Sequence, residues 1–161
     1  MQLIRNLRNN FSYTNIDLVE TLYVCYYFLK RNSNKKVILL DEEKIKNQEL
    51  FGDILLVPER FKDKINWNVD LFFNACSLAE MNKQYVNEYI NLVNTGKPKI
   101  ILHLNSNFLE FPDSKRHIET LASEFHFDSS YFTLLTFFVS PWAPGYRDRE
   151  FIYFSKDLIK R

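Results

Sequence analysis

Short apolar runs alternate with segments of helical periodicity along most of this 161-residue chain. Such alternation typically builds a mostly parallel sheet with helices on its faces, so the sequence predicts an α/β fold. We expect strands at residues 11–18, 36–40, 69–74 and 99–104, a minor strand or extended piece at 53–57, and helices at 19–32 and 78–93.

The carboxyl-terminal third carries a different pattern. Residues 114–125 have helical spacing, and residues 131–139 and 150–154 read as strands on either side of the proline- and glycine-containing segment 140–145. Two strands joined in this way favour an antiparallel hairpin. Most aromatic residues here have strand spacing and are expected in the core, whereas Trp142 and Tyr146 are expected to be exposed.

Length and charge limit the classes of function. The length fits a single domain, residues 1–161. The formal net charge of +1 excludes a strong long-range attraction to nucleic acid or to an anionic membrane. No apolar run is long enough to cross a bilayer, and the start is polar and basic, so we expect a cytoplasmic protein. Cys25 and Cys76 lie in apolar segments without metal-site spacing, which favours buried reduced thiols and no bound metal.

Polar residues follow the predicted parallel strands, at the edge where open α/β sheets bind ligands. A carboxylate such as Asp17, at the end of strand 11–18, can accept hydrogen bonds from both hydroxyls of a ribose. The alternative is that Asp17 caps the helix that follows. The polar residues at these strand ends are Asp17, Asp41, Asn74 with Ser77, and His103 with Asn105.

The start of the second predicted helix offers a structural interpretation of two of its polar residues. Ser77 and Glu80 have the spacing of a capping box, in which each side chain bonds a backbone amide of the other. Gly96 and Pro98 then end the helix. Asn74 has a similar alternative, because it could serve only to hold the turn.

Three segments resemble the sugar O-methyltransferase family. Residues 13–22 (YTNIDLVETL), which run into a tyrosine-rich helix, are similar to the family's second strand and the following helix. Residues 70–81 (DLFFNACSLAEM), with Tyr85 and Tyr89 downstream, resemble its fourth strand, asparagine-to-serine turn and glutamate-methionine helix start. Residues 103–107 (HLNSN) resemble the end of its fifth strand.

The resemblance implies a Rossmann-like class I methyltransferase sheet with helices on both faces, S-adenosylmethionine as cofactor, and methyl transfer to a hydroxyl of a sugar or glycan. Asp17 then corresponds to the ribose-binding acid, and Asp41 to a residue that reads the adenine edge, with Glu42 or Glu43 as alternatives. Asn74 and Ser77 would lie nearest the methionine part. Glu80, one turn deeper, and His103, as a general base for the sugar hydroxyl, are the catalytic candidates, although a lone histidine is more often structural.

The sequence departs from the family pattern at the cofactor turn. Its only glycines are Gly52, Gly96 and Gly145, and none follows a strand and opens a helix. The family's first strand and glycine turn are therefore missing, and residues 1–10 resemble the end of the helix that follows them. Strands 11–18 and 69–74, which normally flank that first strand, would have unpaired edges unless they pair with each other, with a partner chain or in a homo-oligomer. We expect weak or no cofactor binding by the isolated chain.

A rival interpretation is a noncatalytic α/β interaction module or accessory subunit that keeps the fold without the chemistry. The absent glycine turn favours it, whereas Asp17 and Asn74 favour the enzyme. A nucleotide-sugar-modifying enzyme is a third interpretation, and the lack of a phosphate-binding glycine loop counts against it.

Overall fold

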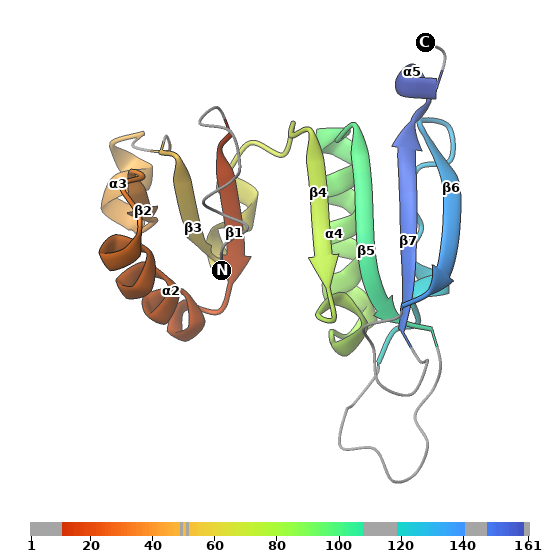
Figure 1. The fold of residues 1–161 in the computed structure, drawn as a ribbon, viewed down its shortest axis with the longest axis horizontal. Coiled ribbons are helices and arrows are strands. Elements are labelled where there is room, and N and C mark those ends of the chain that lie inside the picture. Colours follow the sequence, from red (N-terminus) through yellow and green to blue (C-terminus); the bar gives the residue numbers. More distant parts are fainter. Residues whose placement is uncertain (1–10, 49, 51, 108–118, 141–147, 160–161) are drawn as a thin grey trace, which may run out of the picture. The chain divides into compact units, whose positions relative to one another are not determined.

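The computed structural model describes residues 11–48, 50, 52–107, 119–140 and 148–159. Its contacts divide the chain into two compact units, Met1–Ile65 and Asn66–Arg161, each with its own sheet (Figure 1). The expected helix at residues 1–10 and the expected exposure of Trp142 and Tyr146 lie outside the described residues. The expectation of a single domain stays a prediction.

The first unit is a parallel sheet with helical segments on both faces. Its strands lie in the order β1-β3-β2, so β3 pairs with both neighbours in parallel. Its elements are β1 (Tyr13–Asp17), α2 (Val19–Asn32), β2 (Val37–Leu39), α3 (Glu42–Lys46), β3 (Ile54–Pro58) and the 3₁₀ helix η1 (Glu59–Lys64).

Two apolar clusters, one on each face, hold this sheet. On one face Leu22 of α2 packs with Val37, Ile54 and Leu56, and on the other Phe61 of η1 belongs to the buried cluster. Every residue of β3 is buried, and this explains why a segment expected to be a minor strand lies at the centre of the sheet. A strand covered on both faces gains most from a continuous apolar sequence, and residues 54–57 read Ile-Leu-Leu-Val.

The second unit combines a parallel strand pair with an antiparallel hairpin. Its strand order is β4-β5-β7-β6, in which β4 and β5 are parallel and β7 is antiparallel to both β5 and β6. The predicted carboxyl-terminal hairpin is confirmed. The elements are β4 (Leu71–Ala75), η2 (Leu78–Glu80), α4 (Lys83–Gly96), β5 (Ile100–Ser106), η3 (Ala122–Glu124), β6 (Phe132–Val139), β7 (Asp148–Ser155) and α5 (Lys156–Ile159).

Helix α4 lies against β4 and β5 (Figure 1). The ring of Trp67 packs edge-on to Tyr89 of α4, with centroids 6.2 Å apart, and tilted against Phe72 of β4 at 6.1 Å. The helix ends where a β-carbon on Gly96 would lie 2.3 Å from the Trp67 carbonyl oxygen. Lys97 follows in the left-handed conformation, with φ 52°. The predicted end of the helix at Gly96 is confirmed, but glycine is needed there for space and the left-handed turn falls to Lys97.

The expected α/β class is confirmed by these parallel strands, helices and antiparallel carboxyl-terminal strands. Among the described residues, β1 and β4 are edge strands of two different sheets. Two helix predictions were wrong in part. The helix expected at 78–93 is split into η2 and α4, and of the helix expected at 114–125 the described residues 119–125 contain only η3. No helix in the described ranges is long and apolar enough to cross a membrane.

Candidate functional site

Two asparagines join the carboxyl ends of β4 and β5. The Asn105 amide nitrogen donates to the Asn74 side-chain oxygen at 2.9 Å, and the Asn105 oxygen accepts from the backbone amide of Ala79 at 3.1 Å. Asn105 is fully buried, and an unpaired buried amide is costly, so this pair fixes the turn after β4. The sequence placed Asn105 at a strand end but did not identify it as the partner of Asn74.

Ser77 belongs to the same network, and the capping box expected for it is absent. Its hydroxyl accepts from the Asn74 amide nitrogen at 2.6 Å and makes no cap hydrogen bond to η2. The backbone amides after Ser77 are instead reached by Asn74 and Asn105, at Leu78 and Ala79. The real cap is Asn82, whose side chain accepts from the amide of Tyr85 at the start of α4. Ser77 retains its own hydroxyl proton, which it can donate to a ligand.

Cys76 bends the chain between β4 and η2. Its φ of 57° is a left-handed conformation that a residue other than glycine adopts at a cost. A 2.7 Å hydrogen bond from its amide to the Leu104 carbonyl holds this backbone, and its thiol lies 3.7 Å from the buried carboxylate of Asp148 on β7. Cys76 and Cys25 are both half-buried, and neither forms a disulfide. Nothing in the sequence pattern signalled that Cys76 and Asp148, 72 residues apart, would meet.

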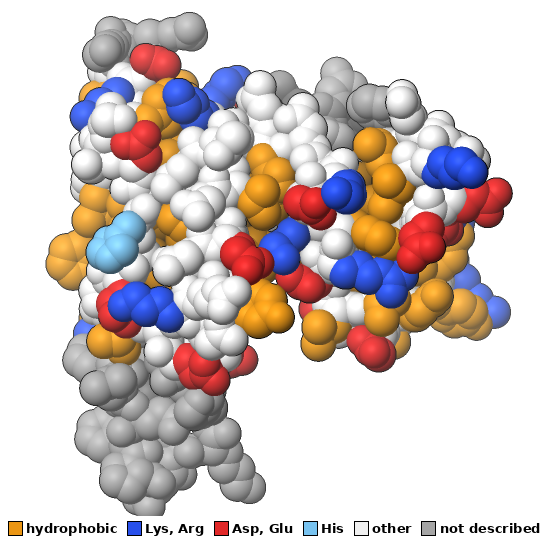
Figure 2. All heavy atoms as spheres, turned by 180° about the vertical axis from the view of Figure 1, so that it is seen from behind, with side chains coloured by type: hydrophobic (Ala, Val, Ile, Leu, Met, Phe, Trp, Pro, Cys, Tyr) orange, Lys and Arg blue, Asp and Glu red, His pale blue; other side chains and the backbone are white. Residues whose placement is uncertain are grey.

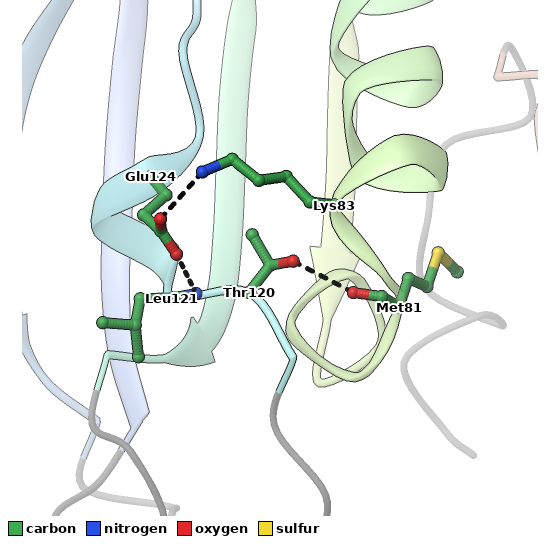
Figure 3. Close-up of polar contacts among 5 residues, drawn as sticks. All are labelled: Met81, Lys83, Thr120, Leu121 and Glu124. Atoms are coloured by element: carbon green, nitrogen blue, oxygen red, sulfur yellow. Dashed lines mark hydrogen bonds and ion pairs between the residues drawn. The ribbon is translucent and has the colours of Figure 1, made fainter.

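Thr120 and Leu121, just before η3, lie beside Met81 at the end of the turn that follows β4 (Figure 3). The Thr120 hydroxyl donates to the Met81 carbonyl at 3.1 Å, and Lys83 pairs with Glu124 at 3.0 Å. The other oxygen of Glu124 accepts from the Leu121 amide. Glu80 lies on the same turn with its side chain exposed, so this catalytic candidate faces solvent beside the asparagine network.

His103 lies directly opposite Asn74 in the pairing of β4 with β5, its Nδ1 is 3.5 Å from the Asn105 amide nitrogen, and it has no exposed surface. It is stacked on Phe151 with ring centroids 4.6 Å apart, and Phe125 and Phe127 pack against its ring. Burial lowers the pKa of His103 to about 3, so the imidazole is neutral at pH 7, and its Nε2 has no hydrogen-bond partner among the described residues. These surroundings match a structural core histidine more closely than a general base, whose pKa should lie near the working pH. The catalytic role of His103 stays a prediction.

Asp17 lies in the first unit, at the carboxyl end of β1. One carboxylate oxygen accepts from the Leu18 amide at 2.7 Å. The N-cap position of α2 is occupied by Leu18, which makes no side-chain cap bond, so the alternative in which Asp17 caps the helix is not realised. Among the described residues, the second oxygen of this half-buried carboxylate accepts no hydrogen bond, which leaves it able to bind a ligand hydroxyl.

Asp41 follows β2 at the same edge of that sheet, because the three strands are parallel. Its carboxylate caps α3 by accepting from the Lys44 amide at 2.8 Å and also forms an ion pair with the Lys44 ammonium. The side-chain hydrogen bond from Lys44 holds the pKa of Asp41 below its usual range. Strand β3 lies between β1 and β2, so Asp17 and Asp41 are separated by about two strand spacings, roughly 10 Å.

The structure therefore brings the candidate residues together in two groups. Asn74, Ser77, Glu80 and His103 lie at or below one turn of the second unit, and Asp17 and Asp41 share a sheet edge of the first. Within the described ranges no three histidine, cysteine or acidic side chains gather in a way that could hold a metal ion. The first group offers amide, hydroxyl, carboxylate and imidazole groups, and the second offers two carboxylates.

Comparison with known proteins does not show a family. No family model and no curated protein match the chain. Among solved structures, the PH0226 protein from Pyrococcus horikoshii OT3 is 14% identical, with 96% of this chain and 86% of that chain covered and a TM-score of 0.45. A protein described as a pericyclic reaction enzyme is 8% identical, with 92% and 44% covered and a TM-score of 0.43. At such low scores neither likeness bears on function.

Proposed function

We propose that the chain is an S-adenosylmethionine-dependent O-methyltransferase that acts on a hydroxyl of a sugar or glycan. The observation that carries the proposal is Asp17, a half-buried carboxylate at the carboxyl end of a parallel strand that keeps an acceptor oxygen for a ligand. A carboxylate in this position suits the hydroxyls of a ribose. The sequence resemblance supplies the cofactor class and the acceptor class.

The candidate residues differ in how well they could bind S-adenosylmethionine. Asp17, in the first unit, would bind the ribose through its second carboxylate oxygen. Asp41 is already engaged by Lys44 and offers less to an adenine. No glycine turn allows the backbone to approach the ligand closely, so we expect the affinity of the isolated chain to be low.

Binding of S-adenosylhomocysteine to the purified chain, measured by titration calorimetry, tests the proposal. We expect a Kd weaker than about 100 μM, equivalent to about 5 kcal/mol of binding free energy. Asp17→Asn should abolish binding, because the amide replaces an acceptor oxygen with a donor. Asp63→Asn, which removes an exposed carboxylate paired with Lys64 in the same unit, is the matched control and should bind like the unmodified chain.

Two outcomes would contradict this account. A low-micromolar Kd would show that the missing glycine turn costs the site little. A folded chain that does not bind at millimolar concentration would favour the second candidate, a noncatalytic interaction module. That candidate is supported by the neutral, buried His103 and by an asparagine pair whose hydrogen bonds are largely used within the fold.

A further inference from the structure

The last strand of the second sheet exposes a strongly apolar edge. Strand β6 has β7 on one side, and the described residues place no strand on the other. Its eight residues, Phe-Thr-Leu-Leu-Thr-Phe-Phe-Val, contain no charge and no proline. Five of its large apolar side chains are exposed: Leu134, Leu135, Phe137, Phe138 and Val139. Proteins usually protect long edge strands with charges or prolines, so an edge of this composition indicates pairing with another strand.

An aromatic ladder leads across the sheet to this edge. His103 of β5 stacks on Phe151 of β7 with centroids 4.6 Å apart, and Phe151 stacks on Phe137 of β6 at 5.9 Å. The strand register places these three residues opposite one another. The ladder ends at Phe137, whose surface is 61% exposed, so a further aromatic ring beyond Phe137 would extend it.

We propose that a second copy of this chain pairs with β6 in an antiparallel, two-fold symmetric manner, with Phe137 of one protomer opposite Phe137 of its partner. A two-fold axis perpendicular to the sheet requires the side chains of directly opposite residues to point to the same face of the sheet. Pairing centred on Phe137 places Thr136 opposite Phe138. These two residues are two positions apart along the strand, so their side chains point to the same face. The β-bulge between Leu134 and Thr136 lies in the pairing of β6 with β7, and the register centred on Phe137 places Leu135 opposite Val139 of the partner.

The size and chemistry of the edge suit a second copy. The five exposed side chains present roughly 450 Å² of apolar surface per protomer, which gives about 900 Å² for two copies before the backbone is added. This lies below the range of about 1,200–2,000 Å² that stable interfaces bury, so a weak association with a dissociation constant of about 10–100 μM is expected. An uncharged strand can face itself without like-charge repulsion, and a Phe–Phe cross-strand pair is among the more favourable ones.

Other edges of the described sheets are less suited to self-pairing. Strand β4 is shorter and follows Asp70, β1 ends at Asp17, and β2 has three residues. Hydrophobic side chains reach the surface at the margin of the second unit where β6 lies, on the left of Figure 2. Strand β4 nevertheless provides a matched control, because its Phe73 is 60% exposed.

Sedimentation velocity of the full chain between about 1 and 200 μM tests the proposal. We expect the unmodified chain to be a dimer at the upper end of this range, a Kd about tenfold or more weaker in Phe137→Lys, and an unchanged Kd in Phe73→Lys. The two lysines of Phe137→Lys would face each other at the axis, and like charges directly opposite are destabilising. A monomeric unmodified chain would overturn the proposal and leave the edge to a strand of another protein. A dimer that survives Phe137→Lys, or is lost equally in Phe73→Lys, would also overturn it.

Cross-linking gives a second test that does not depend on tolerance of a lysine. Directly opposite residues of an antiparallel pair are close enough for a disulfide after small adjustment. Phe137→Cys should form a covalent dimer under mild oxidation, well above the background from Cys25 and Cys76 in the unmodified chain, and Phe73→Cys should not. Failure of Phe137→Cys to cross-link in the folded dimer would refute the proposed register.

Discussion

At the scale of single residues, the polar side chains at the predicted strand ends lie in two kinds of environment, one open to a ligand and one buried in the core. Asp17 keeps an acceptor oxygen for a ligand, whereas His103 has been taken fully into an aromatic core. A buried imidazole whose Nε2 has no partner in the described part of the chain destabilises the fold. Because protonation of this buried ring is unfavourable, the stability of the fold depends on pH.

Burial of His103 should make the chain less stable as the pH falls below about 6.5. The folded pKa is about 3 and the ordinary value is 6.5, so between these values the unfolded state binds a proton that the folded state does not. The free energy of unfolding then falls with falling pH, by about 2 kcal/mol between pH 7 and pH 5. Urea unfolding at pH 7 and pH 5 measures this loss. His103→Phe should remove it.

His126→Gln is the matched control, because His126 is exposed and its loss should leave the slope in place. The lowered pKa values of Asp41, Asp63, Glu124 and Asp128 act at more acidic pH, below the ordinary carboxyl range. An equal loss of stability in His103→Phe and in the unmodified chain would contradict the assignment to His103.

At the scale of secondary-structure elements, the local sequence pattern predicted an element correctly where its conformation depends mainly on its own residues. The bounds of α2 were predicted as found, because apolar residues at helical spacing fill one face and Leu22 anchors it in the core. The start of α4 could not be predicted in this way. Ser77 and Glu80 had the right spacing for a cap, but the Glu80 amide donates to the Ser77 carbonyl oxygen and the Ser77 hydroxyl accepts from Asn74 instead. The neighbouring amide of Ala79 donates to Asn105, 26 residues further along the chain.

The order of the strands was equally inaccessible to local pattern. The apolar run at residues 54–57 suits a strand buried on both faces, but β2 is apolar as well, and only the pairing with both β1 and β2 makes β3 central. The candidate site follows the same rule. Asn74 and Ser77 were found because they lie at the end of one predicted strand, whereas the approach of Asp148 to Cys76 depends on how β7 pairs with β5.

The end of α4 yields a test at this scale. Gly96→Ala would improve helix propensity by about 1 kcal/mol if the position were open. The added β-carbon instead meets the Trp67 carbonyl oxygen at 2.3 Å, so we expect a net loss of about 1–3 kcal/mol in the free energy of unfolding. Thermal and urea unfolding measure it. Thr95→Ala, at the exposed preceding position, should change stability by less than about 0.5 kcal/mol, and a stabilised Gly96→Ala would show that Trp67 moves away at little cost.

At the scale of the whole molecule, each unit has a sheet and buried residues of its own. Leu56 is fully buried at the centre of the first sheet, and Ile101 is fully buried on β5 of the second. Truncation of either residue to alanine should cost about 2–5 kcal/mol. Whether that cost is confined to one unit depends on the cooperativity between them.

We expect each truncation to act on its own unit. In hydrogen exchange followed by mass spectrometry, Leu56→Ala should lose protection in β1, β2 and β3 while β4, β5 and β7 keep theirs, and Ile101→Ala should do the reverse. The physical reason is that the strand hydrogen bonds of the described residues run within each sheet and not from one sheet to the other. The two variants serve as controls for one another, because both remove a large side chain from a fully buried site. If either variant lowered protection evenly in both units, the chain would unfold as the single cooperative domain that its length suggests, and a ligand bound by Asp17 would then stabilise the asparagine turn as well.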